Sequence, residues 1–232
     1  MTNMIKAELY RLKHSNNMFN KMIASSIFCV LFIIIFSSIE RSDGLETISN
    51  CFCISVTIID AIIGLTIGMH YSNKTYYYEI LCGNSPHPII MSKFVVYSLF
   101  VILTFCLPVY IILWVTGIVK DTDPFFLLLT LIAVRFTIFT VGFTMLFKSE
   151  KCFLIVFLRI IAESVIEIFT EVFKNTGVLK SVLNYLPIAQ MQGFEKNISG
   201  KSISIVFISF AVEIMVWYMF VYRSYKKKYF LS

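Results

Sequence analysis

Residues 70–93 read His70-Tyr-Ser-Asn-Lys-Thr-Tyr-Tyr-Tyr-Glu-Ile-Leu-Cys-Gly-Asn-Ser-Pro-His-Pro-Ile-Ile-Met-Ser-Lys93 and form a polar break between two apolar runs. The run before the break covers 51–69, and the run after it covers 94–119. Each run is long enough to cross a hydrocarbon core of roughly 30 Å. The break is therefore expected to be a single loop on one side of a membrane.

This loop carries the signals of a short helix over 74–82. Asn73 is a suitable N-cap, and Gly83 followed by Pro86 and Pro88 is expected to end the helix. Tyrosines and apolar residues four positions apart can pair along it. Such a helix would lie at the membrane interface or against a partner protein. An ordinary interfacial loop is the alternative.

The composition of the whole chain is that of a membrane protein. Of its 232 residues 58% are hydrophobic and 15% are charged, against roughly 45–50% and about 25% in soluble globular proteins. Apolar runs occupy nearly the full length, so 1–232 is predicted to be a single transmembrane domain. The net charge of +6 does not indicate nucleic-acid binding, because the basic residues cluster at the ends of apolar runs.

The apolar runs predict an all-α integral membrane protein with six transmembrane helices. The expected spans are residues 22–39, 51–69, 94–119, 125–147, 152–170 and 203–222. Pro108 is expected to kink the third span, and Asp123-Pro124 to start the fourth. Residues 178–191 are too apolar for a free loop and too short for a span, which predicts short re-entrant or surface helices broken at Pro187.

An amphipathic helix is predicted before the first span. Ile5, Leu9 and Leu12 recur at helical spacing. The other face is expected to carry Lys6, Glu8, Arg11 and Lys13. This pattern is typical of a helix that lies flat on an anionic membrane surface.

The distribution of Lys and Arg predicts the orientation of the chain. Twelve of these residues lie in the segments on one side of the six spans, and six lie in the segments on the other side. Positively charged residues accumulate on the cytoplasmic side of membrane proteins. Both termini are therefore predicted to be cytoplasmic.

Several charged residues lie within the apolar runs, where each costs at least about 2.5–3.5 kcal/mol if it is unpaired. They are Asp60, Arg135, Arg159, Glu163, Glu167 and Glu213, and Glu171 continues the stripe of 159, 163 and 167. The simplest prediction is that they pair, Arg159 with Glu163, and Arg135 with Asp60 or Glu213. The alternative is a pathway for cationic or amphipathic cargo.

No motif for nucleotide hydrolysis or metal catalysis is present. Gly200-Lys-Ser202 resembles the end of a phosphate-binding loop, but that loop needs glycine at position 195, which is Glu195. Neither His-Glu-x-x-His nor Gly-x-Ser-x-Gly occurs. The chain is therefore not predicted to be an enzyme or to bind a cofactor or metal. A proton-coupled transporter or an intramembrane enzyme built on Glu163 and Glu167 are the alternatives from other classes.

Four features together resemble a known family. They are the opening Ile5-Lys-Ala-Glu-Leu-Tyr-Arg-Leu-Lys13, the loop with Glu79, Gly83 and Ser92-Lys93, the segment Tyr185-Leu-Pro187, and the basic C-terminal end. In these features the chain resembles the small ABC-2 type permease subunits of bacterial ABC exporters, including those that remove lantibiotics and bacitracin-like peptides. The resemblance covers essentially the whole chain. The family's arginines around the loop glutamate are replaced here by Tyr76, Tyr77 and Tyr78.

The resemblance implies roles for these segments. The first segment would be an elbow helix, the loop after the second span a cytoplasmic coupling helix that meets the ATPase, and the region after the fifth span short outward-facing helices. Its coupling residues would be Lys74, Tyr76, Tyr77, Tyr78, Glu79 and Gly83. The implied partners are two copies of a separate ATPase, which carries ATP and Mg²⁺, and a second permease subunit, identical or homologous. The implied setting is the bacterial plasma membrane, and the implied function is export of amphipathic peptide antibiotics, or lantibiotic immunity.

Overall fold

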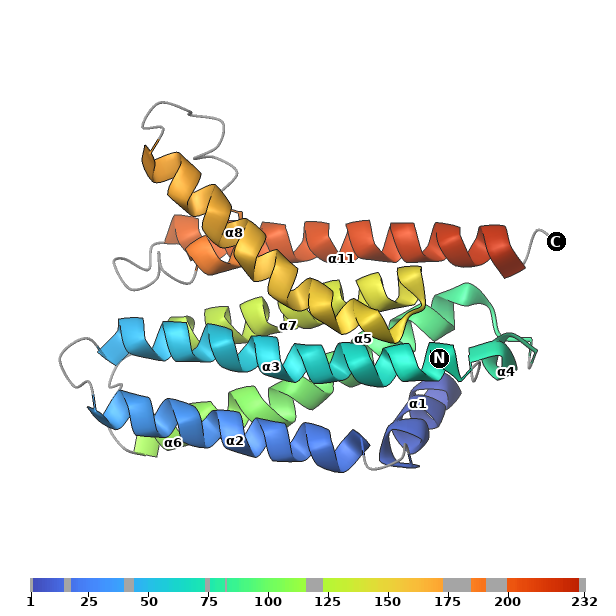
Figure 1. The fold of residues 1–232 in the computed structure, drawn as a ribbon, viewed down its shortest axis with the longest axis horizontal. Coiled ribbons are helices and arrows are strands. Elements are labelled where there is room, and N and C mark those ends of the chain that lie inside the picture. Colours follow the sequence, from blue (N-terminus) through green and yellow to red (C-terminus); the bar gives the residue numbers. More distant parts are fainter. Residues whose placement is uncertain are drawn as a thin grey trace.

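The computed structural model describes residues 2–14, 18–39, 44–73, 76–81, 83–115, 123–172, 185–190 and 200–229. These residues lie in helices and short turns, and no β-strand occurs among them. Figure 1 shows a bundle of long helices, with the first helix and the C-terminal turns at the same end. The all-helical prediction is confirmed for this part of the chain.

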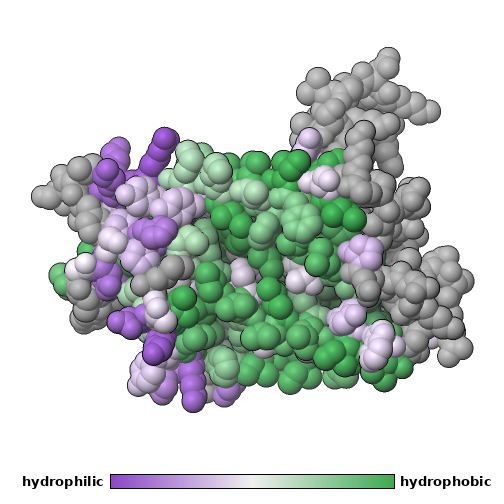
Figure 2. Space-filling view, turned by 180° about the vertical axis from the view of Figure 1, so that it is seen from behind, coloured by the Kyte–Doolittle hydropathy of each residue, from purple (hydrophilic) through white to green (hydrophobic). Residues whose placement is uncertain are grey.

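Five helical segments in the described ranges are long and apolar enough to cross a membrane. They are α2 (Met18–Ile39), α3 (Gly44–Ser72), the continuous run of α5 (Pro86–Val101), η1 (Ile102–Cys106) and α6 (Leu107–Val115), α7 (Asp123–Phe147) and α11 (Gly200–Tyr229). Figure 2 shows a broad hydrophobic belt, with hydrophilic residues gathered at one end of the molecule. The chain is therefore a multi-pass membrane protein.

The hydrophilic end of the bundle carries α1 (Thr2–His14), α4 (Tyr76–Leu81) and the last turns of α11. In those last turns Arg223, Lys226 and Lys227 are exposed. We call this end the basic end.

The sixth expected span, at 152–170, forms α8 (Leu154–Val172), which follows the short 3₁₀-helix η2 (Glu150–Phe153). α8 is a helix, as predicted, but it is not among the five apolar segments. Its sequence contains four charged residues, Arg159, Glu163, Glu167 and Glu171. In Figure 1 α8 is inclined to the other long helices, and it contacts both α3 and α7. Length and apolarity therefore identify five spans, and α8 is not one of them.

Three of the long helices begin four or more residues earlier than predicted. α2 begins at Met18 instead of residue 22, α3 at Gly44 instead of residue 51, and α5 at Pro86 instead of residue 94. The apolar pattern marks only the part of a helix that would lie in hydrocarbon. Backbone hydrogen bonding continues into the polar flank, so the helices extend beyond their apolar cores.

The predicted end of the short helix at Gly83 is confirmed, and Pro86 and Pro88 belong to the helix that follows. Gly83 ends the short helix with a φ of 75°, and its N–H donates to the carbonyl of Ile80 at 2.9 Å. Pro86 instead begins α5 after Ser85, which has an extended backbone. Proline suits the first turn of a helix because the N–H that it lacks has no helical acceptor there.

A π-helical segment, η1, immediately precedes the proline that was expected to kink the third span. Leu107 donates its N–H to the carbonyl of Ile102, five residues back. Pro108 has no N–H to donate to a carbonyl of the preceding turn. The change from α-helical to π-helical hydrogen bonding therefore falls where the regular pattern is interrupted in any case.

The core of the bundle is built from aromatic and β-branched side chains of α3, α5, η1 and α7. Phe52 of α3 packs against Phe105 of η1, with ring centroids 5.0 Å apart. Tyr97, Phe125 and Phe136 are buried in the same cluster. These contacts hold the described middle of the chain together independently of its charged residues.

Gly68 permits a close approach between α3 and η2, and replacing it should destabilise the protein. A Cβ at this position would lie 2.4 Å from the Cα of Glu150 and 2.8 Å from the carbonyl oxygen of Ser149. Both obstacles are backbone atoms, so Gly68→Ala should cost at least about 1–3 kcal/mol, the usual cost of overpacking. Thermal unfolding of the purified chain in detergent measures this effect.

Gly83→Asn is the matched control for that experiment. Nothing lies within 4 Å of a Cβ at Gly83, and Asn tolerates the left-handed φ of 75° found there. We expect this variant to unfold close to the wild-type temperature. Equal unfolding temperatures for Gly68→Ala and Gly83→Asn would contradict the close-approach argument.

Candidate functional site

The short helix predicted in the polar loop is present as α4. Its described part runs from Tyr76 to Leu81, within the expected range of 74–82. The side-chain amide of Asn84 donates to the carbonyl of Glu79 at 2.9 Å, which stabilises the turn after the helix. Lys74 and the side chains of Tyr76, Tyr77 and Tyr78 lie outside the described residues.

Four charged side chains join α4 to α1 and α5. Lys93 of α5 places its Nζ 2.9 Å from Oε2 of Glu8 and 3.1 Å from Oε1 of Glu79. Arg11 of α1 pairs with both of these carboxylates. We call Glu8, Arg11, Glu79 and Lys93 the four-charge cluster. It fixes three separate segments of the chain to one another at the basic end.

The four-charge cluster is balanced and largely removed from water. Two carboxylates face two cations, and the side chains of Glu8 and Lys93 are 2% and 3% exposed. Burial raises the pKa of Glu79, but the positive charges of Lys93 and Arg11 lower it by more, so its pKa lies below the ordinary value. Glu79 is therefore ionised at neutral pH. Loss of any one member would leave a buried charge uncompensated.

The prediction for the first helix was wrong at Glu8, which was assigned to the exposed polar face and is buried. Lys6 and Lys13 are exposed, as expected for that face. Leu9 is 50% exposed, which is compatible with contact to a membrane surface, and Leu12 is buried. The charge of Lys93 accounts for the difference, because it draws Glu8 into the bundle.

Leu81 is a candidate contact residue that the sequence analysis did not single out. It is 78% exposed, the highest exposure among the large hydrophobic side chains of the described residues. Glu79 lies two positions earlier, about 200° away around the helix. Because Glu79 points into the four-charge cluster, Leu81 must point outward. Its side chain is therefore available for contact with a partner protein or with the membrane interface.

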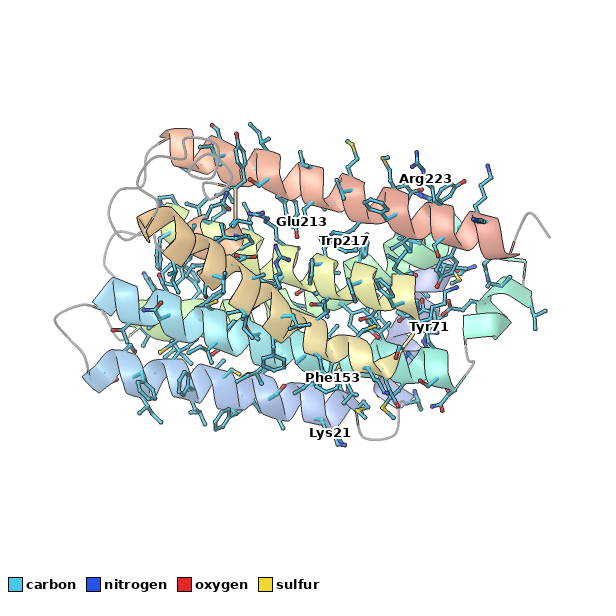
Figure 3. All side chains as sticks on the ribbon, turned by 45° about the horizontal axis from the view of Figure 1, so that its top comes forward. Lys21, Tyr71, Phe153, Glu213, Trp217 and Arg223 are labelled. Carbon is cyan, nitrogen blue, oxygen red and sulfur yellow. The ribbon has the colours of Figure 1, made fainter. Side chains whose placement is uncertain are left out.

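Polar aromatic contacts link α11 to the same end of the bundle. Tyr71 of α3 and Tyr225 of α11 share a hydrogen bond between their hydroxyl groups, and both side chains are buried. His87, in the first turn of α5, lies 2.9 Å from the hydroxyl of Tyr218. Figure 3 shows Tyr71 and Arg223 toward this end of the molecule. α3 and α5 are therefore both joined to α11 at the basic end.

A second ionic site lies deeper in the bundle and joins α7, α8 and α11. Arg135 of α7 places its Nε 2.8 Å from Glu213 of α11. Arg159 of α8 lies 2.9 Å from Glu163 and 3.0 Å from Glu213. We call Arg135, Arg159, Glu163 and Glu213 the inner network. Glu213 lies on the face of α11 that is turned toward the other helices, as Figure 3 shows.

The predicted pairing is confirmed for Arg159, and for Arg135 the structure selects one of the two predicted partners. Arg159 pairs with Glu163, and Arg135 pairs with Glu213 instead of Asp60. Asp60 contacts Thr137. The guanidinium of Arg159 also lies over the rings of Phe136 and Phe139, at 4.7 and 4.3 Å from their centroids. The face of α8 with positions 159 and 163 is thus turned toward α7 and α11.

Residues 185–190 return to the inner network. The carbonyl of Tyr185 accepts a hydrogen bond from Arg135 at 2.9 Å, and Gln190 accepts another from the same guanidinium. The N–H of Ile188 donates to Glu163 at 3.1 Å. Pro187 is buried and begins a short helical turn over 187–190. This part of the predicted re-entrant or surface segment therefore packs against the inner network.

The predicted site residues thus separate into two groups. Glu79 and Gly83 lie at the basic end, and Arg135, Arg159, Glu163 and Glu213 form the inner network. Asp60 belongs to neither group. Glu167 lies on α8, but its side chain is outside the described residues.

An apolar groove of about 410 Å³ opens beside the π-helical segment. It is lined by Ile102, Cys106, Leu107, Tyr110, Phe126, Leu127 and Thr130. All seven residues belong to two of the five apolar segments, so the groove lies in the apolar part of the bundle. Its lining carries no charged side chain, so it is separate from both ionic sites.

Neither ionic site resembles a metal centre, and no group of three or more His, Cys, Asp or Glu residues within the described ranges is arranged to hold a metal ion.

The sequence matches no protein-family model and no curated protein. The function must therefore be argued from the two ionic sites and their positions in the bundle.

Proposed function

We propose that this chain is the membrane-spanning permease subunit of an ATP-driven exporter of the ABC-2 type, powered by a separate ATPase. The observation that carries the proposal is the way in which α4 is attached to the rest of the bundle. This short helix lies between two apolar spans, turns Leu81 outward and is tied by the four-charge cluster to α1 and α5. A helix that is exposed on one side and ion-paired to two other helices on the other can transmit the movement of a bound partner to those helices.

The positive-inside rule supports a cytoplasmic position for α4. The basic end carries the exposed Arg223, Lys226 and Lys227 of α11 and the exposed Lys6 and Lys13 of α1. Such clusters are retained on the cytoplasmic side. Both termini and α4 would then face the compartment that supplies ATP, in the bacterial plasma membrane.

We propose α8 as the sixth span. Its outer face exposes Leu154, Phe157, Leu158, Ile161, Val165 and Ile168, which suits lipid. Its Arg159 and Glu163 are turned inward and paired, as charged residues within a membrane must be. With α8 as a span, residues 185–190 would enter the bundle from the outer side as a re-entrant segment.

The contacts of the four-charge cluster define a route for force. A push on α4 would act through Glu79 on Lys93 of α5, and through Arg11 on α1. α1 is followed directly by the first apolar helix, and α5 opens the third. One contact between α4 and the ATPase would therefore move two spans. Coupling also requires that this contact differ between two states of the ATPase.

The assembly would contain two copies of the ATPase and a second permease subunit, identical or homologous to this one. The cargo would be an amphipathic peptide antibiotic, such as a lantibiotic, or another membrane-partitioned compound. The apolar groove beside η1 supports this class, because it offers contacts in the apolar part of the bundle and no charged group.

Purification of the tagged chain from its native membranes in mild detergent tests the proposal. We expect a second protein with a phosphate-binding loop to be recovered in a fixed ratio, and its ATP hydrolysis to depend on the permease. Recovery of the chain without any ATPase, together with transport activity in vesicles that lack ATP, would contradict it.

The inner network weighs against the proton-coupled transporter considered from the sequence. That hypothesis uses Glu163 as an exchangeable proton site. Both of its carboxylate oxygens accept hydrogen bonds, one from Arg159 and one from the N–H of Ile188. The contacts of Glu163 are those of a structural ion pair.

A further inference from the structure

Asp60 is the acidic residue of the bundle interior that stands outside the inner network. It lies on α3, its residue exposure is 0%, and its Oδ1 is 2.9 Å from the hydroxyl oxygen of Thr137 on α7. Its other oxygen, Oδ2, has no hydrogen-bond partner among the described residues. A carboxylate in this position would be a buried charge with a single neutral donor.

The hydrogen bonds of Thr137 indicate which form Asp60 takes. The hydroxyl oxygen of Thr137 lies within hydrogen-bond distance of two acceptors, Asp60 Oδ1 at 2.9 Å and the carbonyl of Ala133 at 3.0 Å. A hydroxyl group has one proton to donate and can also accept. With an ionised Asp60 only one of the two contacts is a full hydrogen bond. With a protonated Asp60 both are, because the acid donates to Thr137 and Thr137 donates to Ala133.

The charge balance of the neighbouring helices also indicates that Asp60 is protonated. Arg159 of α8 is the cation that acts electrostatically on Asp60. Its guanidinium is already paired with Glu163 and Glu213, and Arg135 of α7 completes a network of two cations and two carboxylates. An ionised Asp60 would add a negative charge that no described cation balances.

The other ionisable groups around Asp60 bring no positive charge to it. Cys106 of η1 interacts electrostatically with Asp60 but carries no positive charge. The thiol of Cys29 on α2 faces the carbonyl of Ser55. In η2, Glu150 lies beside Gly68, about 12 Å along α3 from Asp60, and Lys151 is exposed.

We propose that Asp60 is a resident proton-binding site, protonated at neutral pH, which joins α3 to α7 as a neutral acid through Thr137. Its ligand is a proton. Release of that proton would add a third carboxylate around Arg159, which is already paired with Glu163 and Glu213. The protonation of Asp60 is therefore tied to the position of α8. This inference does not depend on an ATPase partner.

Infrared spectroscopy of the purified full chain in lipid vesicles tests the proposal. The wild type at neutral pH should show the C=O stretching band of a protonated carboxylic acid, and Asp60→Asn should remove it. Thr137→Val should shift the band, because it removes the hydrogen-bond acceptor. Glu150→Gln, at an exposed acid, should leave the band unchanged. Asp60→Asn should keep the wild-type unfolding temperature, since the amide can donate to Thr137 as the acid does.

Labelling aspartate with ¹³C in the wild type makes the test independent of how well the variants fold. The protonated-acid band should shift with the isotope at neutral pH. Absence of an isotope-shifted acid band, or the loss of a carboxylate band in Asp60→Asn instead, would overturn the proposal.

Discussion

Glu79→Lys should detach α4 from the bundle and abolish coupling to the ATPase while leaving membrane insertion intact. The substitution changes the four-charge cluster from two carboxylates and two cations to one carboxylate and three cations. Removing one partner from a buried ionic group costs about 3–5 kcal/mol, and here a like charge is added beside Lys93 and Arg11. The five apolar helices do not depend on Glu79, so the chain should still reach the membrane.

ATP hydrolysis by the co-purified ATPase and export of cargo are the measurements for Glu79→Lys, with chain abundance in the membrane as the check on insertion. Glu150→Lys is the matched control, since it makes the same change in charge at an exposed position. Combining Glu79→Lys with Lys93→Glu restores the balance of charges and should recover part of the activity. Normal export by Glu79→Lys alone would remove the coupling role of the cluster.

Glu213→Met should be the most destabilising single substitution in the inner network. Glu213 serves two arginines, so its loss leaves Arg135 without a carboxylate and Arg159 with only Glu163. The expected cost is about 3–5 kcal/mol in the free energy of unfolding. Unfolding of the purified protein by a denaturing detergent measures it.

The double variant Glu213→Met with Arg135→Met separates lost pairing from lost packing. It removes one charge of each sign and leaves the Arg159 and Glu163 pair intact. We expect it to be more stable than Glu213→Met alone, although Gln190 and the carbonyl of Tyr185 then lose a donor at about 1–3 kcal/mol for each group left unsatisfied. A double variant no more stable than the single one would show that buried charge is not the cause of the instability.

Much of the fold could be predicted because apolar length and helix-terminating residues are local signals. The start of α7 at Asp123-Pro124, the helix at 76–81 and the pairing of Arg159 with Glu163 all depend on residues within a few positions of one another. The choice of Glu213 as the partner of Arg135 was one of two predicted alternatives. It depends on how α7 and α11 pack, which no local pattern specifies.

The errors in side-chain positions arose where one helix meets another. The periodicity of the sequence defines two faces of α1, but it does not specify which residues are turned toward the bundle. Glu8 was expected on the exposed face, and it is buried because it pairs with the buried charge of Lys93. The outward position of Leu81 follows from the inward position of Glu79, which could be known only once its partners on α1 and α5 were seen. Asp60 was expected to be a candidate for an ion pair, and it contacts a threonine instead.

The central claim is that α4 is the surface through which a separate ATPase acts on this chain. The most direct test is a photo-crosslinking amino acid placed at Leu81 in cells that naturally make the protein, with Trp114 as the control. Trp114 is 66% exposed and lies on α6, in a different part of the chain from α4. We predict an adduct from position 81, and not from 114, with a protein whose peptides contain the phosphate-binding loop of an ATPase. Failure to trap an ATPase at position 81, or its equal capture at 114, would contradict the claim.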